Sequence, residues 1–205
     1  TLLVDPSGVH LHRYWDLTSR IEPWTQSFQV AVDRLDEILT EAVAIRLRSD
    51  VPLGVFLSGG IDSSLVAALA AQQSAVPLRT FSIGFAESAF DESAHAGRVA
   101  GLLNTKHQAF VGTPGMFDVL PEMVRHFGEP FGDSSALNVW MLAEKTRRHV
   151  TVALGGDGGD EGFGGYQWYR TFLRIGRWRS FLSPLGVRIV SEILRTPTLR
   201  GFGIA

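Results

Sequence analysis

The stretch LSGGIDSS, residues 57–64, decides the fold class of this chain. It follows an apolar run at residues 51–57 and precedes an alanine-rich stretch at residues 65–71, so it predicts a strand, a glycine turn and the first turn of a helix. The first amides of a helix have no intrahelical acceptor, and glycines let an anion approach the main chain, so the turn predicts a phosphate site. The carboxylate of Asp62 would repel phosphate unless a cation lay between them, which indicates a magnesium nucleotide.

The residues of this stretch separate it from two common phosphate motifs. It contains no Lys, which excludes a Walker A loop, and it lacks the GxGxxG pattern of a Rossmann dehydrogenase. The remaining pattern, SGGxDS, resembles the PP-loop of ATP pyrophosphatases, which hold the β and γ phosphates and leave the α phosphate open to attack. An ordinary turn before a serine-capped helix is the simpler alternative, but it would not need two Gly, three Ser and an Asp together.

Strands and helices are expected to alternate along the chain. The expected strands cover residues 53–57, 79–85, 106–111 and 150–154, and the expected helices cover residues 24–48, 63–72, 92–103, 114–127 and 136–148. This alternation predicts an α/β fold in which a parallel, twisted sheet carries helices on both faces. Ligands of such sheets lie beyond the carboxyl ends of the strands, where the turn at residues 57–64 falls.

A second glycine-rich stretch, GGDGGDEGFGGY at residues 155–166, follows the last expected strand. Its three carboxylates would repel one another, so a divalent cation or a cationic substrate group is the natural compensation. An EF-hand Ca²⁺ site is not expected, because the stretch lacks the Glu that such a loop has near its end. A solvated, flexible loop is the simpler alternative. Because it also follows a parallel strand, we expect it to face the same crevice as the first stretch.

Composition narrows the class of protein. A chain of 205 residues with 45% hydrophobic residues can bury one substantial core, which favours one domain or one and a half. The formal net charge of −2 gives no sign of nucleic acid or membrane binding, and no transmembrane run or signal peptide is visible. The absence of Cys excludes disulfides, thiolate metal sites and a cysteine nucleophile within this sequence, and it fits a cytoplasmic protein.

Five motifs together resemble the synthetase domain of glutamine-hydrolysing asparagine synthetases. They are LSGGIDSS (57–64), FSIGF (81–85), FDES (90–93), EPFGDSSA (129–136) and GGDGGDEGFGGY (155–166). The resemblance covers about residues 14–169 and implies the adenine nucleotide alpha hydrolase, or PP-loop, type of sheet. It also implies that the carboxylate of aspartate attacks the α phosphate of ATP with release of pyrophosphate, and that ammonia from glutamine then displaces AMP to give asparagine.

The resemblance implies a role for each motif position. ATP binding falls to Leu57, Ser58, Gly59, Gly60, Asp62, Ser63, Ser64, Ile83, Gly155 and Gly156. Asp62 and Asp160 match the family's Mg²⁺ ligands, and carboxylates from two loops are chemically suited to bridge a metal to phosphate oxygens. Asp157 matches the catalytic acid near the reacting acyl group. Asp133 and Glu161 are expected to hold the loops in place.

The resemblance also predicts the domain organisation and the partners. Residues 1–23 are expected to be a connector from an N-terminal glutaminase domain, and residues 24–205 a C-terminally truncated synthetase domain. The family's catalytic Lys would lie beyond residue 205, so this segment alone is expected to be inactive. The implied partners are aspartate, glutamine-derived ammonia and the glutaminase domain of the same chain. Nucleic acid and membrane partners are not expected, and a homodimer remains open.

Several alternatives stay open at this point. Gly155 stands where the family usually has Ser, which leaves room for relatives that close a β-lactam ring or cyclise a peptide after the same adenylation. The basic and aromatic stretch at residues 168–200 would suit a PP-loop enzyme that modifies tRNA, although a packed helical face explains it more simply. A nucleotide-binding module without catalysis is the third alternative.

Overall fold

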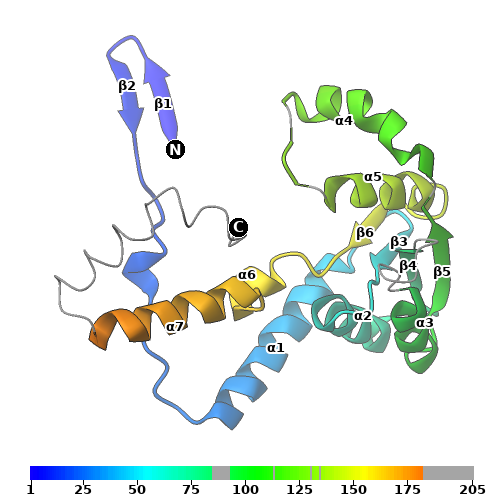
Figure 1. The fold of residues 1–205 in the computed structure, drawn as a ribbon, viewed down its shortest axis with the longest axis horizontal. Helices are drawn as coiled ribbons and strands as arrows, with labels where there is room; N and C mark the ends of the chain where they lie inside the picture. Colours follow the sequence, from blue (N-terminus) through cyan, green and yellow to red (C-terminus); the bar gives the residue numbers. More distant parts are fainter. Residues whose placement is uncertain (85–92, 113, 130, 134, 182–205) are drawn as a thin grey trace, which may run out of the picture. The chain divides into compact units, whose positions relative to one another are not determined.

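The computed structural model describes residues 1–84, 93–112, 114–129, 131–133 and 135–181 (Figure 1). Contacts divide the chain into two units, residues 1–42 and residues 43–205. The expected strand end at residue 85, the expected helix start at residue 92 and every prediction beyond residue 181 lie outside the described residues. Within the described part, no helix is long and apolar enough to cross a membrane.

The first unit begins with a hairpin that the sequence analysis did not predict. Strand β1 (Leu2–Asp5) pairs antiparallel with β2 (Gly8–Leu11), and Asp5 Oδ1 accepts a hydrogen bond from the amide of Ser7 at 2.8 Å, which closes the turn. A short 3-10 helix, η1 (Thr18–Arg20), follows. Helix α1 (Phe28–Arg46) starts later than the predicted residue 24, because the Ser27 hydroxyl accepts the amide of Val30 and caps its first turn.

The second unit contains a four-stranded parallel sheet, which confirms the predicted fold class. Its strands are β3 (Leu53–Phe56), β4 (Arg79–Gly84), β5 (Lys106–Val111) and β6 (Val152–Leu154), in the order β5-β4-β3-β6. The helices that connect them are α2 (Ile61–Gln73), α3 (Ser93–Leu102), α4 (Leu120–Phe127) and α5 (Ser135–Thr146). Each strand is parallel to its neighbours, as crossover connections through helices require.

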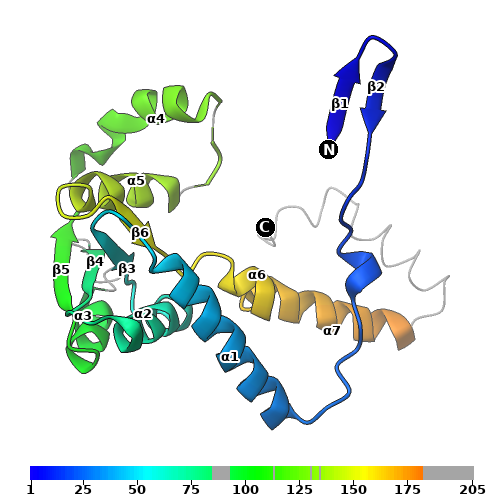
Figure 2. The ribbon, with the colours of Figure 1, turned by 180° about the vertical axis from the view of Figure 1, so that it is seen from behind.

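Helices cover both faces of the sheet. On one face, Phe81, Leu142 and Val150 form a buried cluster against Phe56, Ile83 and Phe110, and Leu142 comes from α5. On the other face, α2 contacts β3, α3 contacts β4 and β5, and each of the two helices carries a fully buried alanine, Ala67 and Ala96 respectively. Figures 1 and 2 show α5 on one side of β3 and β4, and α2 and α3 on the other. Small residues let these two helices approach the sheet closely.

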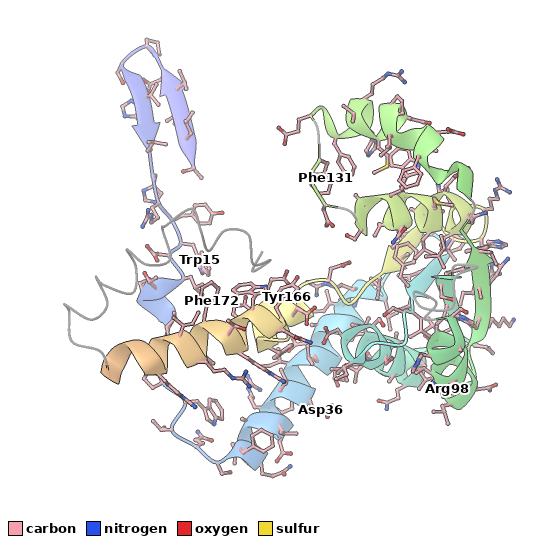
Figure 3. All side chains as sticks on the ribbon, viewed as in Figure 1. Trp15, Asp36, Arg98, Phe131, Tyr166 and Phe172 are labelled. Carbon is pink, nitrogen blue, oxygen red and sulfur yellow. The ribbon has the colours of Figure 1, made fainter. Side chains whose placement is uncertain are left out.

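The predicted helix over residues 114–127 is divided in the structure. A 3-10 segment, η3 (Pro114–Val119), precedes α4, whose start carries a proline and whose end is marked by Gly128 at φ 77°. After α4, Phe131 stacks on Phe127 with 4.7 Å between the ring centroids; Figure 3 labels Phe131 in the segment that leads to α5. That segment ends at Asp133, whose carboxylate accepts the amide of Ser135 at 2.8 Å and so fixes the start of α5.

The strand order places both glycine-rich stretches at one point of the sheet. The chain runs from β3 to β4 to β5 in one direction and then returns to β6 on the other side of β3. The neighbours β3 and β6 are parallel, with Val55 opposite Leu154, so their carboxyl ends lie side by side. This is the switch point at which open parallel sheets bind ligands. Residues 57–64 follow β3, and residues 155–166 follow β6.

Candidate functional site

The first loop, residues 57–60, is braced by its own serine hydroxyls. Ser58 and Ser63 share a hydrogen bond between their Oγ atoms at 2.8 Å, and the amide of Ser58 donates to Ser63 Oγ at 3.2 Å. The amide of Gly60 donates to Ser58 Oγ, and the amide of Ser64 begins the α2 ladder on Gly60 O at 3.1 Å. The amides of the first turn of α2 are therefore left for a ligand, as the predicted phosphate site requires.

Gly59 adopts a left-handed conformation against the start of α3. Its φ is +87°, and a Cβ built on it would lie 2.6 Å from the amide nitrogen of Ala96 and 2.7 Å from the Cβ of His95. A side chain is excluded both by the backbone conformation and by this contact. The glycine therefore packs the loop onto α3, and Gly59 is not among the residues that line the cavity described below.

The second loop contains a short helix that the sequence analysis did not predict. Helix α6 (Gly159–Phe163) starts after Gly158 at φ 90° and ends at Gly164 at φ 68°. The hydroxyl of Tyr166 donates a hydrogen bond to Glu161 Oε1 at 2.7 Å, which ties the end of the loop back to α6. Helix α7 (Gln167–Phe181) follows, and Figure 3 labels Tyr166 and Phe172 along this segment. Glu161 thus has the loop-holding contact that we expected of it.

The two loops interlock at the start of α2. A Cβ built on Gly156 would lie 2.6 Å from the amide nitrogen of Ser63, so the second loop crosses the backbone of the first without room for a side chain. The carboxylate of Asp62 lies against the backbone of Gly159, where a Cβ would meet all three carboxyl atoms within 2.8 Å. The predicted proximity of the two glycine-rich stretches is therefore observed as direct backbone contact.

A cavity of about 680 Å³ opens between these loops and α5. It is lined by Phe56, Leu57, Ser58, Gly60, Ile61, Asp62 and Ser63 from the first loop and its flanks, by Ser82 and Ile83 from the end of β4, by Asn138, Val139 and Leu142 from α5, and by Gly155, Gly156, Asp157 and Asp160 from the second loop. Its volume lies within the range of small-molecule and cofactor sites. The site has an acidic, glycine-rich end and an apolar end.

The structure brings most of the predicted site residues to this cavity. All three predicted acids, Asp62, Asp157 and Asp160, line it, as do eight of the ten predicted ATP-binding positions. Gly59 and Ser64 are the exceptions. The hydroxyl of Ser64 is buried and has no hydrogen-bond partner within the described part of the chain. The first turn of α2 therefore lines the cavity through Ile61, Asp62 and Ser63, and not through Ser64.

Three lining residues of α5 were missed by the sequence analysis. Asn138, Val139 and Leu142 belong to no motif, and an Asn or a Val in a helix carries no signal of its own. Only the tertiary packing of α5 on the sheet brings them to the site. Ser82 lies within the FSIGF motif, but the sequence analysis assigned it no role, although it also lines the cavity. Its hydroxyl lies 3.2 Å from Nε2 of His107; burial lowers the pKa of this His, which favours its neutral form.

The acidic end offers hard oxygen ligands from two different loops. Asp62 comes from α2, while Asp157 and Asp160 come from the second loop. Among the described residues no group of three or more His, Cys, Asp or Glu side chains could hold a metal ion by itself. Carboxylates of this kind suit Mg²⁺ when phosphate oxygens and water complete its coordination. The donor set therefore fits a metal that arrives with a nucleotide, and it does not form a protein-only metal centre.

Comparison with known proteins assigns the chain to a family. The profile of the asparagine synthase family matches residues 34–201, which includes both interlocking loops and α5. The chain belongs to the asparagine synthase family. The match to the asparagine synthase family covers the second loop, GGDGGDEGFGGY, and the whole basic stretch at residues 168–200.

The chain matches less than a third of the length of each of the following relatives. It is 40% identical over 145 residues to asparagine synthetase (glutamine-hydrolysing) 1 of Bacillus subtilis, covering 70% of the chain and 23% of that protein. It is 32% identical over 186 residues to asparagine synthetase (glutamine-hydrolysing) 3 of the same organism, covering 83% of the chain and 30% of that protein. It is also 33% identical over 178 residues to the amidase chyE of Penicillium rubens, covering 78% of the chain and 26% of that protein.

Proposed function

We propose that the full-length protein is an ATP-dependent amide ligase. It adenylates a carboxylate, with aspartate as the first candidate, releases pyrophosphate, and transfers ammonia derived from glutamine to give asparagine. One observation carries the proposal: two glycine-rich loops from neighbouring parallel strands interlock at the start of α2 and line one cavity with three carboxylates. Membership in the asparagine synthase family supports it.

The proposal gives a role to each part of the cavity. The phosphates lie on the first turn of α2, cradled by Ser58, Gly60 and Ser63, because its amides have no intrahelical acceptor. Mg²⁺, when bound by Asp62 and Asp160, supplies positive charge that offsets the phosphate oxygens. Leu57, Ile83 and the apolar side chains of α5 surround the remainder of the nucleotide. Gly155 and Gly156 let the second loop approach the substrate closely.

The chemistry proceeds in two steps. An oxygen of the substrate carboxylate attacks the α phosphorus of ATP, the bond from this phosphorus to the bridging oxygen of the β phosphate breaks, and pyrophosphate leaves. Ammonia then attacks the acyl carbon, and AMP leaves with the oxygen that came from the carboxylate. Asp157, which lines the cavity from the second loop, accepts the proton that the nitrogen loses. Ammonia is proposed to come from a glutaminase domain of the same chain; a homodimer and a cytoplasmic location remain predictions.

A second candidate function uses the same first step with another carboxylate. A Cβ built on Gly155 would lie 2.7 Å from Oδ2 of Asp157, so the carboxylate folds back into the space that a side chain at this position would take. With Gly at residue 155, the acyl site therefore differs in shape from a site that has Ser at this position. For this reason the alternative function is a ring-closing or peptide-cyclising ligase of the same family, which acts on a different carboxylate.

Exchange of labelled pyrophosphate into ATP tests the proposal with the full-length protein. We expect exchange that depends on aspartate. Asp62→Asn should reduce it at least about a hundredfold, since a ligand of the metal is lost. Asp36→Asn, which makes the same change at an exposed residue of α1, serves as the control and should leave exchange unchanged.

The pattern of exchange separates the candidates. Exchange with other carboxylates but not with aspartate would favour the ring-closing or peptide-cyclising class. No exchange with any carboxylate would contradict the ligase proposal. Full activity of Asp62→Asn would remove the metal assignment while leaving the ligase proposal in place.

A further inference from the structure

Helix α5 brings one polar side chain to the apolar end of the cavity. Helix α5 leads directly into β6, which is parallel to β3, so α5 runs antiparallel to the strands and its first turns lie at their carboxyl ends. Leu142 packs in the core cluster with Phe56 and Ile83. Asn138 lies four residues earlier, on the same face of the helix, and therefore one turn closer to the ligand edge of the sheet.

The amide of Asn138 is available to a ligand. The residue is half-buried, and its side chain makes no hydrogen bond to any residue that the structure describes. The serine hydroxyls of the first loop, by contrast, are hydrogen-bonded to each other. A half-buried carboxamide without a protein partner carries one acceptor and two donor hydrogens that only a ligand or water can satisfy. Its neighbours on the cavity wall, Val139 and Leu142, are apolar.

We propose that Asn138 recognises the edge of the adenine base of ATP; this inference rests on the proposed function. A carboxamide donates and accepts at the same time, which complements a ring nitrogen beside an exocyclic amine, as in the pairing of Asn with adenine in DNA. The charged residues of the cavity, Asp62, Asp157 and Asp160, all lie on α2 and the second loop. The phosphates and the acyl group belong at that end, and the flat, apolar base belongs against α5.

Two nucleotides and one substitution test the assignment. Purine riboside triphosphate is ATP without the N6 amino group. We expect the full-length protein to bind it on the order of tenfold more weakly than ATP in calorimetric titrations with Mg²⁺. In Asn138→Leu, which is similar in size, the affinity for ATP should fall about tenfold and the preference for ATP over the purine analogue should drop several-fold. Binding of inorganic triphosphate should not change.

Matched variants separate recognition from folding. Gln72→Met removes a carboxamide at an exposed position near the end of α2 and should leave the preference for ATP intact. If Asn138→Leu does not fold, as judged by loss of triphosphate binding, Asn138→Ala makes the same test, because Ala favours a helix more than Asn does.

Four results would overturn the assignment. An unchanged preference for ATP in the Asn138 variants would exclude base recognition by this side chain. An effect confined to the KM of the carboxylate substrate would place Asn138 in the acyl site instead. Equal loss of both nucleotides would indicate a purely structural role. Failure of the unsubstituted protein to bind either nucleotide would contradict the proposed function itself, and the inference with it.

Discussion

Gly156 shows at the scale of single residues how the two loops depend on each other. Its Cα passes so close to the start of α2 that a Cβ would lie 2.6 Å from Ser63 N and 2.9 Å from the carbonyl carbon of Asp62. Both neighbours are backbone atoms, which cannot rotate away. The absence of a side chain at residue 156 is therefore a steric requirement of the site as well as a source of flexibility.

Substitution of Gly156 by Ala should separate the loops. We expect the free energy of unfolding to fall by about 1–3 kcal/mol from overpacking, and ATP affinity to fall at least about tenfold. Gly162→Ala is the control, since nothing lies within 4 Å of a Cβ built there. It should leave stability unchanged or raise it by up to about 1 kcal/mol, because Ala favours a helix more than Gly does. Urea unfolding and calorimetry measure the two effects. Equal behaviour of both variants would show that the loops do not touch in solution.

At the scale of elements, the connection from α6 to α7 is held by a charge-assisted hydrogen bond. Tyr166 donates to Glu161, which raises the pKa of Tyr166 to about 12 and lowers the pKa of Glu161 below its ordinary value of 4.5. The stabilisation from Glu161 is present above that ordinary value and is lost as pH falls through the lowered pKa. The stabilisation from Tyr166 is present below its ordinary value of 10.0 and is lost as pH rises through about 12.

Removing the carboxylate of Glu161 should return Tyr166 to ordinary behaviour. In Glu161→Gln we expect the pKa of Tyr166 to fall from about 12 towards 10.0, because a neutral amide no longer favours the protonated phenol. Carbon-13 NMR of labelled tyrosine follows each of the three Tyr residues separately. A pKa of Tyr166 that is the same in both proteins would mean that α6 and Tyr166 are not joined in solution.

The strands of the parallel sheet and the helices between them could be predicted from the sequence, whereas the N-terminal hairpin and α6 could not. The expected strand at residues 53–57 agrees with β3 to within one residue, because an apolar run bounded by turn residues carries a local signal. The hairpin of β1 and β2 was missed because residues 1–23 as a whole are expected to be a connector, although apolar residues flank Asp5-Pro6-Ser7-Gly8 on both sides. Helix α6 is too short to show any periodicity.

The candidate site was predicted where it consists of motifs and missed where it depends on packing. Both loops follow parallel strands, so the topology rule places them at the same edge of the sheet. The pairing of β6 with β3 makes them neighbours there. The contribution of Asn138 arises only because α5 crosses the sheet in this register, and no local pattern records that crossing. Ser64 is a similar case: the motif includes the residue, but it does not line the cavity, and its buried hydroxyl has no hydrogen-bond partner among the described residues.

At the scale of the whole molecule, the switch point of the sheet organises every part of the site. The order β5-β4-β3-β6 sets the β3 loop beside the β6 loop, and the direction of α5 brings its first turns to the same edge. The matched region is only 23% of the Bacillus subtilis asparagine synthetase 1 length, so the full-length protein is the proper subject of any test of activity. The central claim is that this edge supports attack on the α phosphate of ATP.

Transfer of oxygen-18 tests that claim most directly. Aspartate labelled with oxygen-18 in its side-chain carboxylate is turned over by the full-length protein with ATP and glutamine, and AMP, phosphate and pyrophosphate are analysed by mass spectrometry. The account predicts one labelled oxygen in AMP and none in pyrophosphate, since the carboxylate oxygen attacks the α phosphorus and leaves with AMP. Label in inorganic phosphate, or AMP without label, would contradict it.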